Sequence, residues 1–160
     1  MVIVVLVLGI GTGQLKAQDS GWKSGNSFSV GFPVGNLENY AHSFGVYGNF
    51  DYNFNKHFAA RFDLGWNDFS GPEKTWVDLD ETVHTIHPNM SVWEFTAGFR
   101  AKVSIVYVEA RGGYFTGVDQ WGFTPAVGLK LGRFDLQGNF NIAGDYHWGG
   151  LRLAYYYGSK

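Results

Sequence analysis

The stretch SFGVYGNFDYNFNKHFAARFDLGWN, residues 43–67, decides the fold, because apolar and polar residues alternate along it with a period of two. In an extended chain Phe44 and Val46 lie on one face, whereas Asp51 lies on the other. The alternation stops at Asn-Lys-His, residues 55–57, and then resumes. Two alternating runs separated by a short polar break predict two antiparallel strands joined by a tight turn.

The same alternation recurs along the chain, and no segment shows a helical period. Connections of two to four residues follow the second, fourth and sixth segments, whereas about twenty residues, 70–89, follow the third. Short turns on one rim and longer loops on the other are typical of a barrel that crosses a membrane. The sequence therefore predicts an all-β fold, an eight-stranded antiparallel transmembrane β-barrel. The expected strands cover 24–34, 41–54, 58–67, 93–102, 106–114, 123–131, 134–142 and 150–157.

The composition supports this class and excludes others. The chain of 160 residues has 23 Gly, 18% aromatic residues and only 16% charged residues, whereas a soluble domain has about 25% charged residues. A net charge of −2 without a basic patch argues against nucleic-acid binding. The absence of Cys excludes disulfides, thiolate metal sites and thiol nucleophiles.

The N-terminal segment reads as a secretory signal. MVIVVLVLGI, residues 1–10, is apolar but too short to span a bilayer as a helix, and the small residue Ala17 follows it closely. We therefore expect a signal peptide over 1–17, cleaved after export, and a barrel domain over 18–160. No Lys or Arg precedes the apolar run, which leaves open whether Met1 is the true start. The alternative is a buried N-terminal strand.

The charged residues indicate which face of the barrel points inward. They are concentrated on the polar face of three neighbouring strands, whereas the first and seventh strands carry Ser, Asn and Gln there. A water-exposed face would carry charge on every strand, so we expect the polar face to line a narrow lumen and the apolar face to contact lipid. Buried charges are costly unless they pair, which predicts mutual ion pairs. The expected lumen charge network is Arg61, Asp63, Glu94, Arg100, Glu109 and Arg111.

The long connection 70–89 carries the main candidate for recognition. Acidic and histidine side chains could bind a divalent cation there, but an acidic outer loop is usually only solvated, so no metal site is assigned. A second polar and aromatic group, Asp145 to Trp148, forms a rim that could contact a partner. The candidate partner-contact residues of the long connection are Trp76, Asp78, Asp80, Glu81, His84 and His87.

Several short motifs resemble a known family. They are Gly-Phe-Pro-Val-Gly at 31–35, Leu-Gly-Trp at 64–66 and Pro-Ala-Val-Gly-Leu-Lys-Leu-Gly at 125–132. With them, the chain resembles the small outer-membrane β-barrel domain family of Bacteroidetes-type bacteria, which has an OmpA/OmpX-like architecture. The resemblance implies the fold and a place in the outer membrane of a Gram-negative cell, and it implies no single activity.

The sequence predicts no enzyme and no cofactor. His42 and Ser43 are adjacent in a strand and point to opposite faces, and Ser91 could meet His147 only through loop geometry. We expect a structural or interaction role, with a plugged polar lumen and outer loops that meet a partner or surface. The expected partners are outer-membrane lipid, lipopolysaccharide and an outer-membrane or extracellular protein. The alternatives are a lipid A-modifying enzyme, a narrow channel for ions or small solutes, and a soluble ligand-binding barrel.

Overall fold

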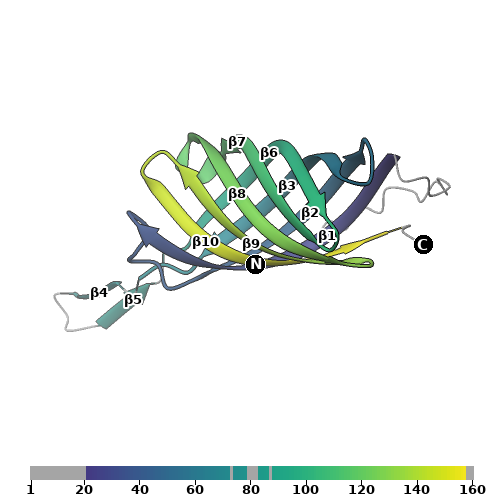
Figure 1. Ribbon diagram of the computed structural model, residues 1–160. Helices are drawn as coiled ribbons and strands as arrows, with labels where there is room; N and C mark the ends of the chain where they lie inside the picture. Colours follow the sequence, from purple (N-terminus) through teal and green to yellow (C-terminus); the bar gives the residue numbers. More distant parts are fainter. Residues whose placement is uncertain (1–20, 73, 79–82, 87, 158–160) are drawn as a thin grey trace.

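The computed structural model describes residues 21–157 except 73, 79–82 and 87, so the predicted signal peptide lies outside the described residues. Eight antiparallel strands close into a barrel in the order β1-β10-β9-β8-β7-β6-β3-β2, which confirms the predicted fold (Figure 1). Within the described residues, no helix is long and apolar enough to cross a membrane. The barrel strands are β1 (Gly21–Gly35), β2 (Ser43–Asn53), β3 (Phe58–Phe69), β6 (Met90–Val103), β7 (Val106–Phe115), β8 (Gln120–Leu131), β9 (Phe134–Ala143) and β10 (Tyr146–Tyr156).

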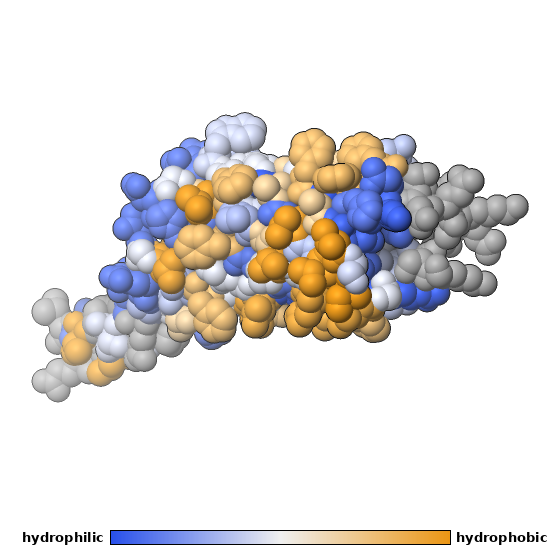
Figure 2. Space-filling view, viewed as in Figure 1, coloured by the Kyte–Doolittle hydropathy of each residue, from blue (hydrophilic) through white to orange (hydrophobic). Residues whose placement is uncertain are grey.

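The alternation seen in the sequence sorts the side chains between the two faces of the barrel. On β1, Phe28 is 60% exposed on the outside, whereas its neighbours Ser27 and Ser29 are buried in the lumen. Phe28 lies opposite Leu153 of β10 and Val46 of β2, so apolar side chains meet across neighbouring strands. Repeated around the barrel, this register produces the apolar outer surface visible in Figure 2.

The connections divide the barrel into two distinct ends. At the short-turn end lie the connections 54–57, 104–105 and 132–133. At the long-loop end lie 36–42, 70–89, 116–119 and 144–145. Aromatic pairs mark the outer surface near both ends: Trp22 and Tyr52 near the short turns have ring centroids 5.1 Å apart, and Tyr114 and Trp121 near the long loops have theirs 5.5 Å apart.

The long-loop end differs from the prediction in three places. The connection 70–89, expected to be irregular, contains the hairpin of β4 (Lys74–Val77) and β5 (Val83–Ile86). The hairpin forms because β-branched residues such as Val77 and Val83 pair across it, and it extends away from the barrel (Figure 1). A short 3-10 helix, η1 (Thr116–Val118), occupies the connection expected after β7. The last connection is only Gly144 and Asp145, since Gly144 adopts a left-handed φ of 58° that permits a tight turn.

Candidate functional site

An apolar cluster lies in the lumen at the long-loop end. Trp148 is its centre, and its ring meets Phe69 and Phe115 edge-on, with centroids 5.5 and 5.4 Å apart. Trp148 is 1% exposed, so the expectation of a contact surface from Asp145 to Trp148 was wrong for this residue: its inward position on β10 buries the ring. We call this group the outer apolar cluster: Leu37, Phe69, Val92, Phe115, Val118, Ala143 and Trp148.

Below this cluster the lumen is filled by charged side chains centred on Asp63. Arg61 Nε donates to Asp63 Oδ1 at 2.8 Å, and Arg152 Nη1 donates to Asp63 Oδ2 at 2.6 Å. Arg111 also hydrogen-bonds Asp63 Oδ2, and Asn49 Nδ2 donates to Oδ1 at 2.9 Å. Asp63 therefore compensates three buried guanidinium groups at once.

Glu109 forms the second centre of the network, nearer the short-turn end. Arg100 Nε donates to Glu109 Oε2 at 2.8 Å, and Arg111 Nε lies 2.9 Å from Oε1. Gln137 Nε2 donates to the same Oε1 at 3.0 Å. Arg100 Nη1 extends the network by a 2.8 Å bond to Asp135 Oδ2.

Glu94 lies in the same lumen. Tyr47 donates its hydroxyl to Glu94 Oε1 at 3.1 Å, and Asn67 Nδ2 donates to the same oxygen. Arg152 Nη2 lies 3.9 Å from Glu94 Oε2, which joins Glu94 to the Asp63 centre. The structure thus places all six residues of the expected charge network in the lumen and brings them together: Arg61, Asp63, Glu94, Arg100, Glu109 and Arg111.

The network also includes residues that the sequence analysis did not assign to it. Asp51, Asp135 and Arg152 are buried on the inward face of β2, β9 and β10. Their alternation parity was visible in the sequence and could have found them. Asp135 lies on the seventh strand, so the expectation that this strand carries Ser, Asn and Gln on its inward face, with charge concentrated on three strands, was incomplete. The nine charged members are thus four guanidinium groups and five carboxylates: Arg61, Arg100, Arg111, Arg152, Asp51, Asp63, Glu94, Glu109 and Asp135.

Tyrosine rings cover the guanidinium faces, and glycines make room for the rings. Arg152 stacks over the Tyr47 ring at 3.5 Å, and Arg100 stacks over Tyr107 at 3.9 Å. A Cβ at Gly65 would overlap the ring of Tyr47, and one at Gly128 would overlap the ring of Tyr107. These two glycines therefore allow large aromatic side chains to lie flat across the narrow lumen.

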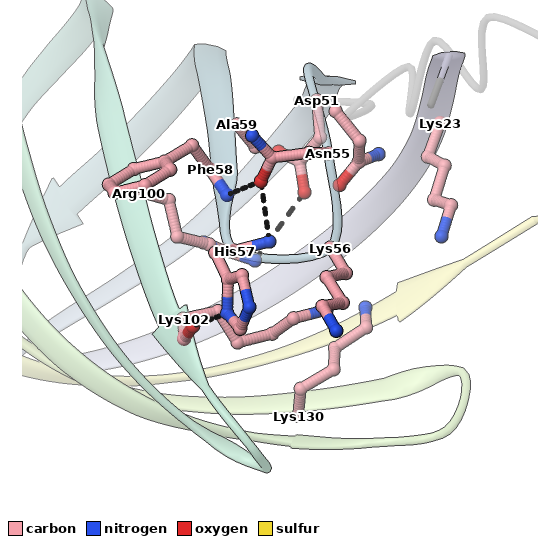
Figure 3. Close-up of a pocket in the computed structure, with 11 residues that line it drawn as sticks. Lys23, Asp51, Asn55, Lys56, His57, Phe58, Ala59, Arg100, Lys102 and Lys130 are labelled. Atoms are coloured by element: carbon pink, nitrogen blue, oxygen red, sulfur yellow. Dashed lines mark hydrogen bonds and ion pairs between the residues drawn. The ribbon is translucent and has the colours of Figure 1, made fainter. Parts of the chain in front are cut away.

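At the short-turn end the lumen opens into a small cavity of about 30 Å³. Figure 3 shows that its walls come from β1, β2, β3, β6 and β8 and from the turn that carries His57. His57 is held there by a 3.1 Å contact between its Nδ1 and the carbonyl oxygen of Lys102. We call this cavity the basic mouth, because four lysines line it: Lys23, Lys56, Lys102 and Lys130.

The expected partner-contact loop lies at the opposite end. In the β4–β5 hairpin, Trp76 pairs with His84 along the backbone, and Asp78 follows β4 on the surface. The other three candidates, Asp80, Glu81 and His87, lie outside the described residues. Among the residues that are described, no group of three or more His, Asp or Glu side chains could hold a metal ion.

One pair with potential chemistry was not anticipated. Ser70 Oγ lies 3.4 Å from His42 Nε2 at the long-loop end, because the backbone of Ser70 hydrogen-bonds the carbonyl oxygen of His42 at 3.0 Å. The pairs weighed from the sequence are not brought together: Ser91 Oγ donates instead to Asp68 at 2.8 Å, and the ring of His147 stacks on Phe140.

Comparison with known proteins shows the fold and no family. No family model and no curated protein matches the chain. The structure is similar to the crystal structure of Ail, the attachment invasion locus protein of Yersinia pestis, with a TM-score of 0.51, 12% identity, and coverage of 87% of this chain and 99% of Ail. It is also similar to Ail in complex with the heparin analogue sucrose octasulfate, with a TM-score of 0.53 at the same identity and coverage. This likeness shows a shared small-barrel fold.

Proposed function

We propose that this chain is an integral outer-membrane barrel that acts through its long-loop end, with a lumen sealed by its own side chains. The observation that carries the proposal is the β4–β5 hairpin. It is a separate two-stranded sheet, and Val77 and Val83, which pair across it, are 62% and 63% exposed. A lone two-stranded hairpin is marginally stable in water. A partner that covers its apolar side chains would stabilise it.

Three observations support a place in the outer membrane. The apolar outer face, the aromatic pairs near both ends and the alternation of short and long connections are typical of outer-membrane barrels. The fold shared with Ail and the resemblance to the Bacteroidetes-type barrel family agree with this location. In this proposal a signal over 1–17 directs export, the apolar face contacts membrane lipid and lipopolysaccharide, and the short turns face the periplasm.

The charge of the outer connections indicates which kind of partner could bind there. Ail has been crystallised with a sulfated heparin analogue, but the four outer connections of this chain hold seven acidic residues and one basic residue, Lys74. Repulsion disfavours a polyanionic sugar at such a surface, and we infer a protein partner with a neutral or basic face. The acidic residues are Glu38, Glu73, Asp78, Asp80, Glu81, Asp119 and Asp145.

Photo-crosslinking in the native outer membrane tests this function. A benzophenone amino acid at Val77 or Val83 is expected to give one discrete protein adduct. The same group at Val106, which is 45% exposed on the barrel surface, serves as the control for lipid-facing positions. Equal adduct patterns from all three positions, or none from the hairpin positions, would contradict a partner at the hairpin.

The contact between Ser70 and His42 favours a second candidate, a lipid A-modifying enzyme. Both residues lie at the long-loop end, but in the described part of the chain no carboxylate contacts His42 to orient it. Mass spectrometry of lipid A from cells with and without the protein separates the two functions. The interaction role predicts identical lipid A from both kinds of cell. If cells with the protein lose an acyl chain from lipid A, and cells with the Ser70→Ala variant do not, the protein is an enzyme.

A further inference from the structure

Among the described residues, the basic mouth carries more positive than negative charge. Its lining includes four lysines and Arg100 but one carboxylate, Asp51. That carboxylate is already engaged, because Arg100 Nη1 lies 3.4 Å and Arg61 Nη1 3.7 Å from its oxygens. The nearby Asp135 is likewise occupied by Arg100 and by the hydroxyl of Tyr107. Within the part of the chain that the structure describes, the lysines therefore face the cavity without a matching acid.

Lys130 shows this imbalance most clearly. Its Nζ is buried and has no hydrogen-bond partner among the described residues. It lies 3.5 Å from the centre of the Tyr156 ring, a cation–π contact that satisfies none of its three N–H donors. A buried ammonium group without hydrogen bonds is costly, so an acceptor from outside the protein would stabilise it.

The geometry suits an anion that enters from the short-turn end. Lys56 and Lys130 extend toward one another from opposite walls of the mouth, and Lys23 points toward the same opening (Figure 3). A cavity of about 30 Å³ holds only a few atoms, so it suits a compact polar group that enters partway from the opening and not a drug-sized molecule, which needs roughly 300 Å³ or more. Convergent ammonium groups supply several donors to one compact group with several acceptor oxygens.

We propose that the basic mouth binds a phosphate group, with Lys56 and Lys130 as its principal ligands and Lys23 and Lys102 as flanking charges. The group could belong to a soluble phosphate compound or to the head group of a phospholipid in the adjacent leaflet. This site is at the opposite end of the barrel from the β4–β5 hairpin. Its existence does not depend on the proposed interaction role.

The test is a calorimetric titration of the folded, full-length barrel with inorganic pyrophosphate. The detergent should be an uncharged maltoside, because phosphocholine detergents would themselves occupy the site. We expect one binding site per barrel. We expect affinity about tenfold lower in Lys130→Gln, the loss typical of a charged hydrogen bond, and several-fold lower in Lys56→Gln. Lys74→Gln, at the opposite end, is the matched control and should bind as the unchanged protein does.

A second arm identifies the source of the phosphate. Native mass spectrometry of barrels in maltoside with added phosphatidylglycerol should show one retained lipid if a head group is the ligand, and none in the double variant Lys56→Gln/Lys130→Gln. Pyrophosphate binding without lipid retention would assign the site to a soluble compound. Binding of neither, or equal losses in the Lys74→Gln control, would overturn the proposal. Lys56 lies in a turn, so its single variant keeps the test valid even if Lys130→Gln impairs folding.

Discussion

The two ends of the barrel differ in the side chains that line the lumen. At the long-loop end, apolar side chains such as Trp148 and Phe69 pack together in the interior, and acidic connections lie beyond them. At the short-turn end the lumen opens into a cavity lined by lysines. Between these ends lies the charge network around Asp63 and Glu109.

Apolar packing and buried ion pairs contribute to stability in different ways. Apolar packing excludes water and needs no charged partners, which is consistent with the sealed lumen that we propose at the long-loop end. Buried ion pairs are weak contributors to stability as a whole but expensive to break, because a single lost partner leaves an uncompensated charge. The outer apolar cluster and the charge network should therefore respond differently to substitution.

The largest effect is expected in the charge network. Asp63→Asn removes the carboxylate that three arginines share, so the free energy of unfolding should fall by about 3–5 kcal/mol, the cost of breaking a buried pair. Denaturant titration of the barrel in detergent, followed by the mobility shift of the folded form on unheated gels, measures it. Asp68→Asn on the same strand is the control. Asp68 bonds exposed Ser91, so we expect about 1 kcal/mol or less.

A loss in Asp63→Asn no larger than in Asp68→Asn would mean that water or mobile ions already compensate the lumen arginines. The lumen would then be wet along its length. The contrast between a sealed end and an open end would lose its basis.

The sequence predicted the barrel and most of its lumen because both follow from alternation. Parity alone places Arg61, Glu94 and Arg111 on the inward face, and a narrow lumen then forces them together. Which carboxylate pairs with which arginine could not be predicted, because the pairing depends on strand stagger around the closed barrel. For example, Arg152 of β10 reaches Asp63 of β3, although 89 residues separate them in the sequence.

The sequence did not predict features that leave no periodic pattern of apolar and polar residues. Leu37 lies in the connection 36–42 yet is 1% exposed, since its side chain folds into the end of the lumen. Nothing in a single loop position distinguishes such a residue from a solvated one. Trp148 was misplaced for a related reason: the predicted start of the last strand at 150 put it in a loop, whereas β10 begins at Tyr146. The basic mouth was missed because its lysines are spread over 23–130 and meet only in the closed barrel.

A smaller effect should follow from a cavity in the outer apolar cluster. Leu37→Ala leaves a cavity in the outer apolar cluster and should lower the free energy of unfolding by about 2 kcal/mol, at the lower limit for buried leucine because a loop can partly collapse into the space. The same denaturant titration applies. Val77→Ala, which truncates an exposed hairpin residue, should change stability by less than about 0.5 kcal/mol. A loss below about 0.5 kcal/mol in Leu37→Ala would show that the connection 36–42 does not seal the lumen in solution.

Removal of the β4–β5 hairpin should have the smallest effect on stability and the largest effect on partner binding. Replacing residues 74–86 by a short Gly-Ser linker removes β4 and β5, whose strands pair with each other and not with the barrel. The free energy of unfolding should stay within about 0.5 kcal/mol of the unchanged protein, since lengthening or shortening a flexible surface connection alters closure entropy only slowly. This variant lacks the two crosslinking positions, so its binding is measured by co-purification of the same partner protein in mild detergent. We expect that co-purification to disappear. A large loss of stability would instead place the hairpin against the rim as part of the seal, and the long-loop end would then be a closure rather than a binding surface.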